Sequence, residues 1–136
     1  TVTYAHTTVT PISTTGNATD FGDLTVARYG SAAGSSQTRG IFSGGSTGAD
    51  SNVIDYVTIA STGNATDFGD LSVARDYPSG TSNSVRMITA GGDVSAVKNT
   101  IDYVTIASTG NATDFGDLTI ARYTPAACSD CHGGLA

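Results

Sequence analysis

A ten-residue phrase, TGNATDFGDL, occurs three times in the chain and limits the folds that the chain can adopt. The copies occupy residues 15–24, 62–71 and 109–118, so successive copies lie 47 residues apart. A period of about 20–50 residues is typical of arrays in which one supersecondary unit stacks on the next, because a single unit cannot bury its apolar face alone. The sequence therefore predicts an array of similar units.

Composition indicates that these units are built from β-strands. Val, Ile, Thr and Tyr recur at regular intervals, whereas all 12 acidic residues are Asp and Glu is absent. β-Branched and aromatic residues favour strands, and Asp, Asn, Gly and Ser favour tight turns. We predict one all-β repeat domain over residues 1–136. We also expect a processed chain or a fragment, since the first residue is Thr1 rather than Met.

Charge and hydropathy limit the partners of the chain. The formal net charge is −6 at pH 7, whereas nucleic acids and anionic membrane surfaces attract basic patches. No apolar run approaches the roughly 20 residues that a membrane-spanning helix needs. We therefore expect neither a nucleic-acid partner nor a membrane span.

Each unit can be drawn as four short strands joined by turns. In residues 29–75 the predicted strands are 29–36, 38–45, 53–61 and 67–75. The same register divides the chain into residues 1–28, 29–75, 76–122 and 123–136. The first segment holds the third and fourth strands of a unit, the last holds the first and second, and the two between are complete. Four antiparallel strands with a period of about 40–50 residues are typical of a β-propeller blade.

Matching places in the two complete units carry a recognisable pattern. Residues 41–45 read Ile-Phe-Ser-Gly-Gly, Asp55 and Tyr56 follow in the third strand, and Phe68 precedes Arg75. The next unit repeats this pattern with Gly91, Gly92, Asp102, Tyr103, Phe115 and Arg122. The order resembles the kelch repeat, in which an apolar strand ends in a double glycine and an aromatic residue precedes a terminal Arg. One departure is Phe where kelch blades usually have Trp.

The resemblance implies an all-β, kelch-like propeller of four-stranded antiparallel blades. We interpret Asp55, Tyr56, Phe68 and Arg75 as residues that pack between blades and cap turns, rather than as a ligand site. Arrays with such similar units also resemble repeat proteins of bacteriophages and marine microbes.

The number of strands predicts association. The chain holds three blades' worth of strands, whereas propellers have roughly four to eight blades. We expect two chains to close as a C2 homodimer with six blades. The N-terminal half-blade of each chain, residues 1–28, would then pair with the C-terminal half-blade, residues 123–136, of its partner.

A short motif near the C-terminus could hold a cofactor. Cys128, Cys131 and His132 form the sequence C-x-x-C-H, which is the attachment sequence of c-type haem. In such a site the thiols bond the haem and the histidine is an axial iron ligand. By alignment of the units, the motif lies across a turn of a blade. The alternative is a Ser- and Gly-rich turn with free thiols or a strained local disulfide.

The repeated phrase offers two further candidate sites. Its two carboxylates could bind Ca²⁺, which prefers clustered oxygen ligands. These candidates are Asp20, Asp23, Asp67, Asp70, Asp114 and Asp117. The Asn-Ala-Thr sequons at Asn17, Asn64 and Asn111 could accept a glycan. For both features the alternative is turn capping, because Asn, Asp and Thr side chains bond local backbone.

The function that we expect is non-catalytic. His6 and His132 are the only histidines, and no repeated base accompanies the abundant Ser and Thr. The module would bind a glycan or a protein, or serve as structure on a virion or cell surface, and we favour an extracellular or virion-associated location. Candidate ligand contacts lie at basic positions and where the units differ. They are Arg39, Arg86, Tyr29, Asp76 and Tyr123. The alternative is an electron carrier with haem c at Cys128, Cys131 and His132.

Overall fold

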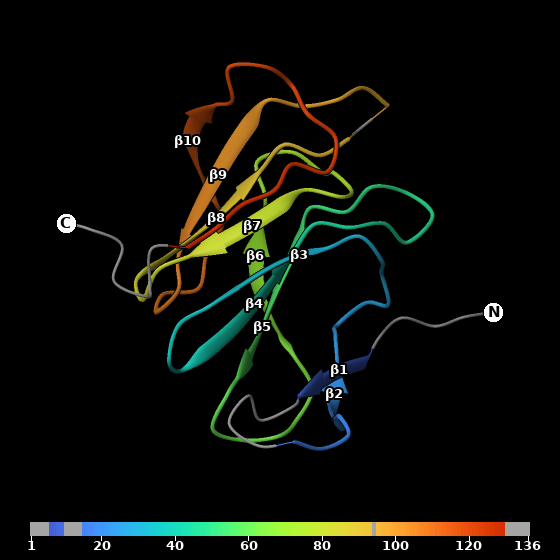
Figure 1. Cartoon of the computed structure of the whole chain (residues 1–136), viewed down its shortest axis with the longest axis vertical. Coiled ribbons are helices and arrows are strands. Elements are labelled where there is room, and N and C mark those ends of the chain that lie inside the picture. Colours follow the sequence, from blue (N-terminus) through green and yellow to red (C-terminus); the bar gives the residue numbers. More distant parts are fainter. Residues whose placement is uncertain (1–5, 10–14, 94, 130–136) are drawn as a thin grey trace.

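The computed structural model of the chain describes residues 6–9, 15–93 and 95–129. Within these residues all regular structure is β-strand, and the ten strands form three antiparallel sheets. Figure 1 shows the sheets stacked in chain order, with the two-stranded sheet at the bottom and the last four-stranded sheet at the top. The predicted all-β class is confirmed. No helix that could cross a membrane occurs in the described part of the chain.

Each complete unit is a four-stranded meander. The first sheet of this kind contains β3 (Ala32–Ser35), β4 (Arg39–Ser43), β5 (Val53–Thr58) and β6 (Thr66–Asp70). The second contains β7 (Ser79–Ser82), β8 (Arg86–Ala90), β9 (Thr100–Thr105) and β10 (Thr113–Asp117). The strands of both sheets are adjacent in chain order. Before them, β1 (His6–Val9) pairs with β2 (Thr19–Asp23).

The fourth strand of each unit differs from the prediction. A strand was expected to continue to Arg28 and Arg75, but β2 ends at Asp23 and β6 ends at Asp70. The repeated phrase is therefore half loop and half strand. After β6 the chain leaves the sheet because its N–H groups bond the loop before β5, where Leu71 N–H donates to the carbonyl of Asn52 at 2.7 Å.

A β-bulge inside each copy of the phrase sets the direction of its phenylalanine. Asp55 pairs with Asp67 and Ile54 pairs with Gly69, so Phe68 is an extra residue in β6. Gly69 has a φ of 144°, a conformation that side chains rarely adopt. Bulges of this kind redirect a side chain and increase local twist. Phe21 in β2 and Phe115 in β10 occupy the same extra position.

The core lies between the two four-stranded sheets. It contains residues from both, and all of them are nearly inaccessible to water: Ala32, Ile41, Ile54, Phe68, Leu71, Met87, Val104 and Ile106. Phe68 is only 3% exposed, which agrees with the expectation that this aromatic residue packs between blades. Met87 fills the space over Gly34, where an added Cβ would lie 2.8 Å from its Cγ. A single sheet of this chain could not bury these side chains alone.

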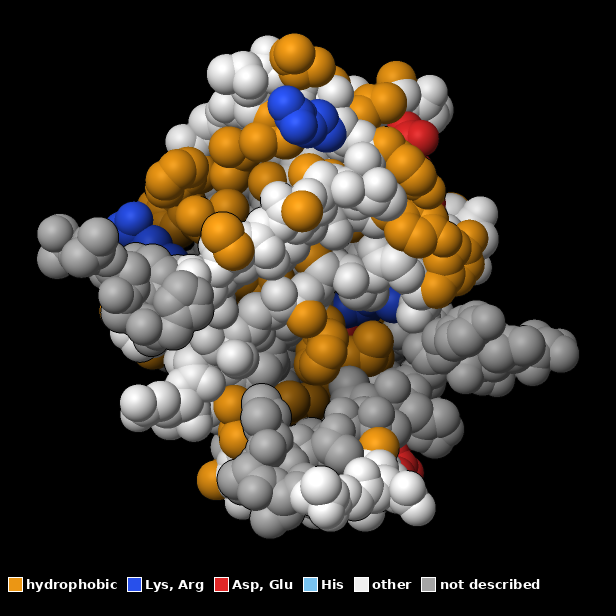
Figure 2. Space-filling model, viewed as in Figure 1, with side chains coloured by type: hydrophobic (Ala, Val, Ile, Leu, Met, Phe, Trp, Pro, Cys, Tyr) orange, Lys and Arg blue, Asp and Glu red, His pale blue; other side chains and the backbone are white. Residues whose placement is uncertain are grey.

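The sheets form an open array in the described residues, and no closed barrel or propeller is present there. The two ends of the array differ in exposure. Phe115, the copy of Phe68 in the last sheet, is 54% exposed because no further sheet covers it in the described residues. Ile120 is 66% exposed, whereas its copies Val26 and Val73 are 46% and 37% exposed. Figure 2 shows hydrophobic side chains spread over the upper part of the molecule, where β7–β10 lie.

Candidate functional site

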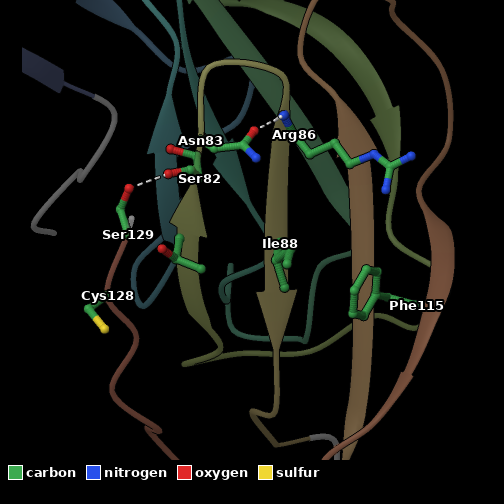
Figure 3. Close-up of a pocket in the computed structure, with 8 residues that line it drawn as sticks. Ser82, Asn83, Arg86, Ile88, Phe115, Cys128 and Ser129 are labelled. Atoms are coloured by element: carbon green, nitrogen blue, oxygen red, sulfur yellow. Dashed lines mark hydrogen bonds between the residues drawn. The ribbon is translucent and has the colours of Figure 1, made fainter. Parts of the chain in front are cut away.

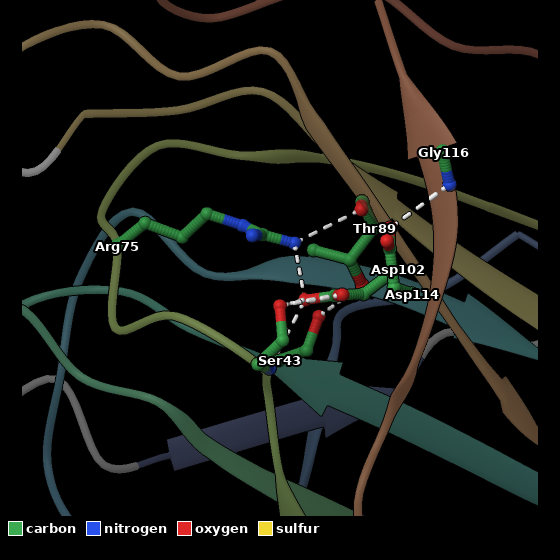
Figure 4. Close-up of polar contacts among 7 residues, drawn as sticks. Ser43, Arg75, Thr89, Asp102, Asp114 and Gly116 are labelled. Carbon is green, nitrogen blue, oxygen red and sulfur yellow. Dashed lines mark hydrogen bonds and ion pairs between the residues drawn. The ribbon is translucent and has the colours of Figure 1, made fainter.

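The contact between two successive units, which we call a seam, is centred on a buried ion pair. In the second seam, between residues 29–75 and 76–122, Arg75 Nη2 lies 2.9 Å from Asp102 Oδ2, and both side chains are fully buried. Arg75 also donates to the carbonyl of Thr89 at 3.0 Å, and the hydroxyl of Ser72 donates to Asp102 at 2.7 Å. Figure 4 shows this network together with Ser43, whose hydroxyl lies 2.8 Å from that of Thr89.

The first seam, between residues 1–28 and 29–75, has the same ion pair one period earlier. Arg28 Nη2 lies 2.8 Å from Asp55 Oδ2, and the hydroxyl of Thr25 donates to Asp55 Oδ1 at 2.6 Å. The third copy of these ion-pair residues is incomplete in the described residues. Arg122 and Thr119 are exposed, and no carboxylate of a following unit faces them there. The interpretation of Asp55 and Arg75 as packing residues agrees with this geometry.

Burying the ion pair costs desolvation free energy, and the pair also fixes how the two units pack. Burial lowers the pKa of Arg75, although the charge of Asp102 and its hydrogen bond raise it. Within the described residues, Nε and Nη1 of Arg75 are buried without a hydrogen-bond partner. A buried pair with unmet donors adds little net stability, because desolvation offsets the attraction. The ion pair has a stronger effect on the register in which the two units pack, since a shift of one unit would leave each of the two charges buried without its partner.

The loop half of the phrase forms the rest of each seam. Gly110 N–H donates to the carbonyl of Phe68 at 2.7 Å, and Ala112 N–H donates to that of Asp70 at 2.7 Å. The N–H of Asp70 donates in return to Asn111 Oδ1 at 3.1 Å. In the first seam, Asn64 Oδ1 accepts from Asp23 N–H at 3.1 Å. The Asn of the sequon is therefore a link between units at both seams.

Arg39 and Arg86, two of the predicted ligand contacts, lie at the hairpin end of the inner strands. The guanidinium of Arg39 covers the ring of Tyr56 at 4.4 Å and donates to the carbonyl of Ile106 at 2.8 Å. Arg86 covers Tyr103 in the same way, at 4.7 Å. The contacts of Arg39 join two units without any ligand. Arg86 is its exposed copy.

Tyr29, Asp76 and Tyr123, the other three predicted contacts, are brought together at the opposite end of the strands. The ring centroids of Tyr29 and Tyr77 are 6.1 Å apart, and those of Tyr77 and Tyr123 are 5.4 Å apart. We call these three rings the tyrosine ladder. Tyr29 and Tyr123 are 43% and 49% exposed, so the ladder has faces open to solvent. The backbone bridge between Asp76 and Asp93 holds the adjoining segments together.

Carboxylates surround the tyrosine ladder and affect one another. Burial raises the pKa of Asp76, and the charges of Asp50 and Asp93 raise it further. Partial burial also raises the pKa of Tyr123, with additional contributions from Tyr77 and Asp76. These shifts mean that the end of the molecule carrying the ladder concentrates negative charge beside aromatic rings.

Sequence reasoning missed Tyr77, the central ring of the ladder. It aligns with Gly30 and Thr124, and all three residues have positive φ, with Tyr77 at 46°. A bulky residue in this conformation is uncommon and marks a strained position. The signal was present in the sequence, because a tyrosine stood where the preceding unit had a glycine.

A cavity of about 360 Å³ opens beside the last sheet. Figure 3 shows Arg86, Ile88 and Phe115 along it, with Ser82 on β7 and with Cys128 and Ser129 on the irregular segment beside β7. The hydroxyl of Ser129 donates to the carbonyl of Ser82 at 2.5 Å, which holds Ser129 against the end of β7. Cys128 is exposed and has a free thiol. Cys131 and His132, the other predicted haem contacts, lie outside the described residues.

The predicted calcium ligands lie in the bulged strands. Asp20 Oδ1 accepts from Gly22 N–H at 3.2 Å, and Asp114 Oδ1 accepts from Gly116 N–H at 2.9 Å. In both contacts the aspartate caps the bulge, as the turn-capping alternative to calcium binding predicts. The described residues contain no group of three or more His, Cys, Asp or Glu side chains placed to hold a metal ion. Calcium binding stays a prediction for all six candidates: Asp20, Asp23, Asp67, Asp70, Asp114 and Asp117.

A scan against protein-family models and a search of curated proteins found no match for this chain. The kelch resemblance therefore stays a prediction from the sequence, based on the double glycines and on the Asp, Tyr, Phe and Arg residues that recur with them. In this structure these residues have clear roles between units. Gly45, for example, has a φ of 101° and donates its N–H to the carbonyl of Arg75 at 2.9 Å.

Proposed function

We propose that the chain is a non-catalytic binding or structural module built from kelch-like blades, and that it binds a glycan or a protein segment through the tyrosine ladder. One observation carries the proposal. Residues that recur in every unit are used in the seams, whereas two adjacent repeat positions at which the units differ supply the ladder and Asp76 beside it. Function on repeat scaffolds depends on such variable surfaces rather than on the framework.

The chemistry of the ladder suits this kind of ligand. Tyrosine offers a large, rigid apolar face together with a hydroxyl that can donate and accept hydrogen bonds, and it is enriched in recognition surfaces. Asp50, Asp76 and Asp93 add acceptors for hydroxyl or ammonium groups. The acidic surroundings disfavour ligands that are themselves anionic, such as nucleic acids.

A binding assay with two variants tests which end of the molecule is used. Tyr77→Gly removes the central ring and suits the positive φ at this position, since the preceding unit has Gly30 there. Arg86→Ala, at the other end of the strands, is the matched control. On a glycan array and in a whole-cell pull-down, Tyr77→Gly should abolish binding and Arg86→Ala should retain it. Loss with Arg86→Ala alone would contradict the assignment, and no binding by the wild-type chain would leave only a structural role.

We also propose that two chains close the open array into a six-bladed C2 ring. The exposed apolar residues on the last sheet support this, because a monomer rarely exposes a large contiguous apolar patch. Size-exclusion chromatography with light scattering should give about twice the monomer mass of 13.6 kDa. A single species at the monomer mass at all concentrations would rule out the closure.

A further inference from the structure

We infer that the seam between two copies repeats the loop contact of the internal seams. Residues 16–18 of one copy would dock on residues 115–117 of the other, and Arg122 would be left without a carboxylate. This inference rests on the two-chain association proposed above and specifies its register. We call this contact the trans seam.

The internal seams show which groups the trans seam would use. In each of them a Gly-Asn-Ala loop lies against the Phe-Gly-Asp segment of the preceding unit. Two backbone N–H groups of the loop donate to carbonyls of the Phe-Gly-Asp segment at 2.7 to 2.9 Å. The side-chain oxygen of the loop Asn accepts a hydrogen bond from the N–H of the Asp at 3.1 Å. Residues 16–18 have the same sequence, Gly-Asn-Ala, as residues 63–65 and 110–112. A second copy therefore brings a loop of the required sequence.

Both halves of this contact are open in one chain. Gly16, Asn17 and Ala18 are exposed, and so is Phe115. A Cβ at Gly69 would lie 2.4 Å from the carbonyl oxygen of Gly110, whereas a Cβ at Gly116 would meet nothing within 4 Å. The surface that receives a loop at the internal seams is thus present at residues 115–117, and none of the described loops covers it.

Apolar surface continues around the uncovered strand. Phe115 is 54% exposed, whereas its copies Phe21 and Phe68 at the internal seams are 7% and 3% exposed. The cavity beside Phe115 is also lined by Thr81, the copy of Gly34, and in the second seam Met87 lies over Gly34 and is 1% exposed. A partner that buries this surface must present a sheet face of matching shape. A copy of the same chain does so, because its units already pack on one another in this way.

One group would be missing from the trans seam. Thr8 pairs with Asp20 in β1–β2, as Asp55 pairs with Asp67 in β5–β6. The N-terminal unit therefore has a threonine at the position where the other units provide the carboxylate of the ion pair. Arg122 would enter the trans seam without the partner that Arg28 and Arg75 have. The trans seam should be weaker than the internal seams for this reason.

A steric variant with a matched control tests the register. Gly116→Ala adds a Cβ that meets nothing within 4 Å in one chain but would collide with the docked loop. Gly110→Ala introduces similar backbone strain, since the φ values are 133° and 152°, and its Cβ also meets nothing within 4 Å. In sedimentation equilibrium, Gly116→Ala should raise the dimer dissociation constant at least about tenfold, and Gly110→Ala should leave it unchanged. A dimer unaffected by Gly116→Ala would overturn this register while leaving two-chain closure intact.

A second variant tests the missing carboxylate by a gain rather than a loss. Thr8→Asp should lower the dissociation constant about tenfold by pairing with Arg122, and Thr8→Asn should not. Adding Arg122→Met to Thr8→Asp should remove the gain. An equal effect of Thr8→Asp and Thr8→Asn, or a gain that survives Arg122→Met, would overturn the inference. A monomeric wild-type chain would overturn the closure itself, which separates the two proposals.

Discussion

The guanidinium of Arg75 reaches across from one unit to the carboxylate of Asp102 in the next, at 2.9 Å, and both side chains are fully buried. The pair joins two sheets whose described strands form no ladder with each other, although loop N–H groups donate across the seam. Folding of one unit is therefore coupled to that of its neighbour, since each would otherwise bury an isolated charge. Such nearest-neighbour coupling is the physical basis of cooperativity in repeat proteins.

Removing one partner of this pair should be strongly destabilising. We expect Arg75→Met to lower the free energy of unfolding by about 3–5 kcal/mol, because Asp102 would remain buried without a counter-charge. Urea denaturation followed by circular dichroism measures the change. Arg122→Met is the matched control and should cost less than about 0.5 kcal/mol, as expected of an exposed side chain. The double variant Arg75→Met/Asp102→Leu should recover most of the loss, and a double variant as unstable as the single one would contradict this account.

The bulge glycines separate backbone strain from contact between units. Gly69→Ala should lower the free energy of unfolding by about 2–4 kcal/mol, because strain and a collision with the carbonyl of Gly110 act together. Gly116→Ala has the same strain without that collision in one chain. Measured on the monomer by thermal unfolding, it should cost at least about 1 kcal/mol less. Equal losses would show that the loop contact contributes nothing.

Arg39 and Arg86 provide a second internal comparison. Arg39→Ala should cost about 2 kcal/mol, since it removes both a cation–π contact and a charged hydrogen bond to Ile106. Arg86→Ala should cost about 0.5 kcal/mol, because the contact with the ring of Tyr103 is on an exposed side chain. Chemical denaturation of both variants gives the difference. A larger loss for Arg86→Ala would reverse the assignment of these two residues.

The aspartates beside the tyrosine ladder predict a dependence of stability on pH. Burial and the charges of Asp50 and Asp93 raise the pKa of Asp76 in the folded state. The folded state therefore holds this proton more tightly, so stability should fall as the pH rises from the unfolded pKa of Asp through the higher folded value. Asp76→Asn should stabilise the protein at pH 7 by about 0.5 kcal/mol or less, since solvent screens partly exposed charges. The gain should disappear near pH 3, and an equal gain at both values would contradict the electrostatic cause.

The C-x-x-C-H motif leads to a spectroscopic prediction. If the chain is the binding module proposed above, the purified protein should lack a Soret band, even after co-expression with a haem attachment system. Cys131→Ser should then leave the mass of the assembly and binding at the tyrosine ladder unchanged. A covalently attached haem that is lost in Cys131→Ser would instead support the electron carrier.

Periodicity was sufficient to predict the units, and turn chemistry was not sufficient to predict where their strands end. The spacing of the repeated phrase placed four strands in each unit correctly. It missed the end of β6 because the apolar residues after Asp70 look like strand residues, whereas their N–H groups bond the preceding loop. The bulge at Phe68 could not be predicted from the sequence either, since it depends on the pairing of β5 with β6.

The candidate site was predicted only in part for a related reason. Tyr29, Asp76 and Tyr123 were chosen because the units differ there, and they do meet in space. Arg39 was chosen for its charge, but its carbonyl partner, Ile106, is 67 residues away and belongs to the next unit. Contacts between units are tertiary, so the sequence of one unit says little about which of its polar side chains already bond to a neighbouring unit.

The repeated phrase contains both surfaces of a seam, because its loop half docks on the strand half of the preceding copy. Copying one unit therefore copies a donor surface together with its own acceptor. A gene that gains or loses a unit by recombination would need no new interface for the altered chain to stack. Unit number in such a protein can change in a single genetic event, and the curvature of the array then decides which numbers close into a ring.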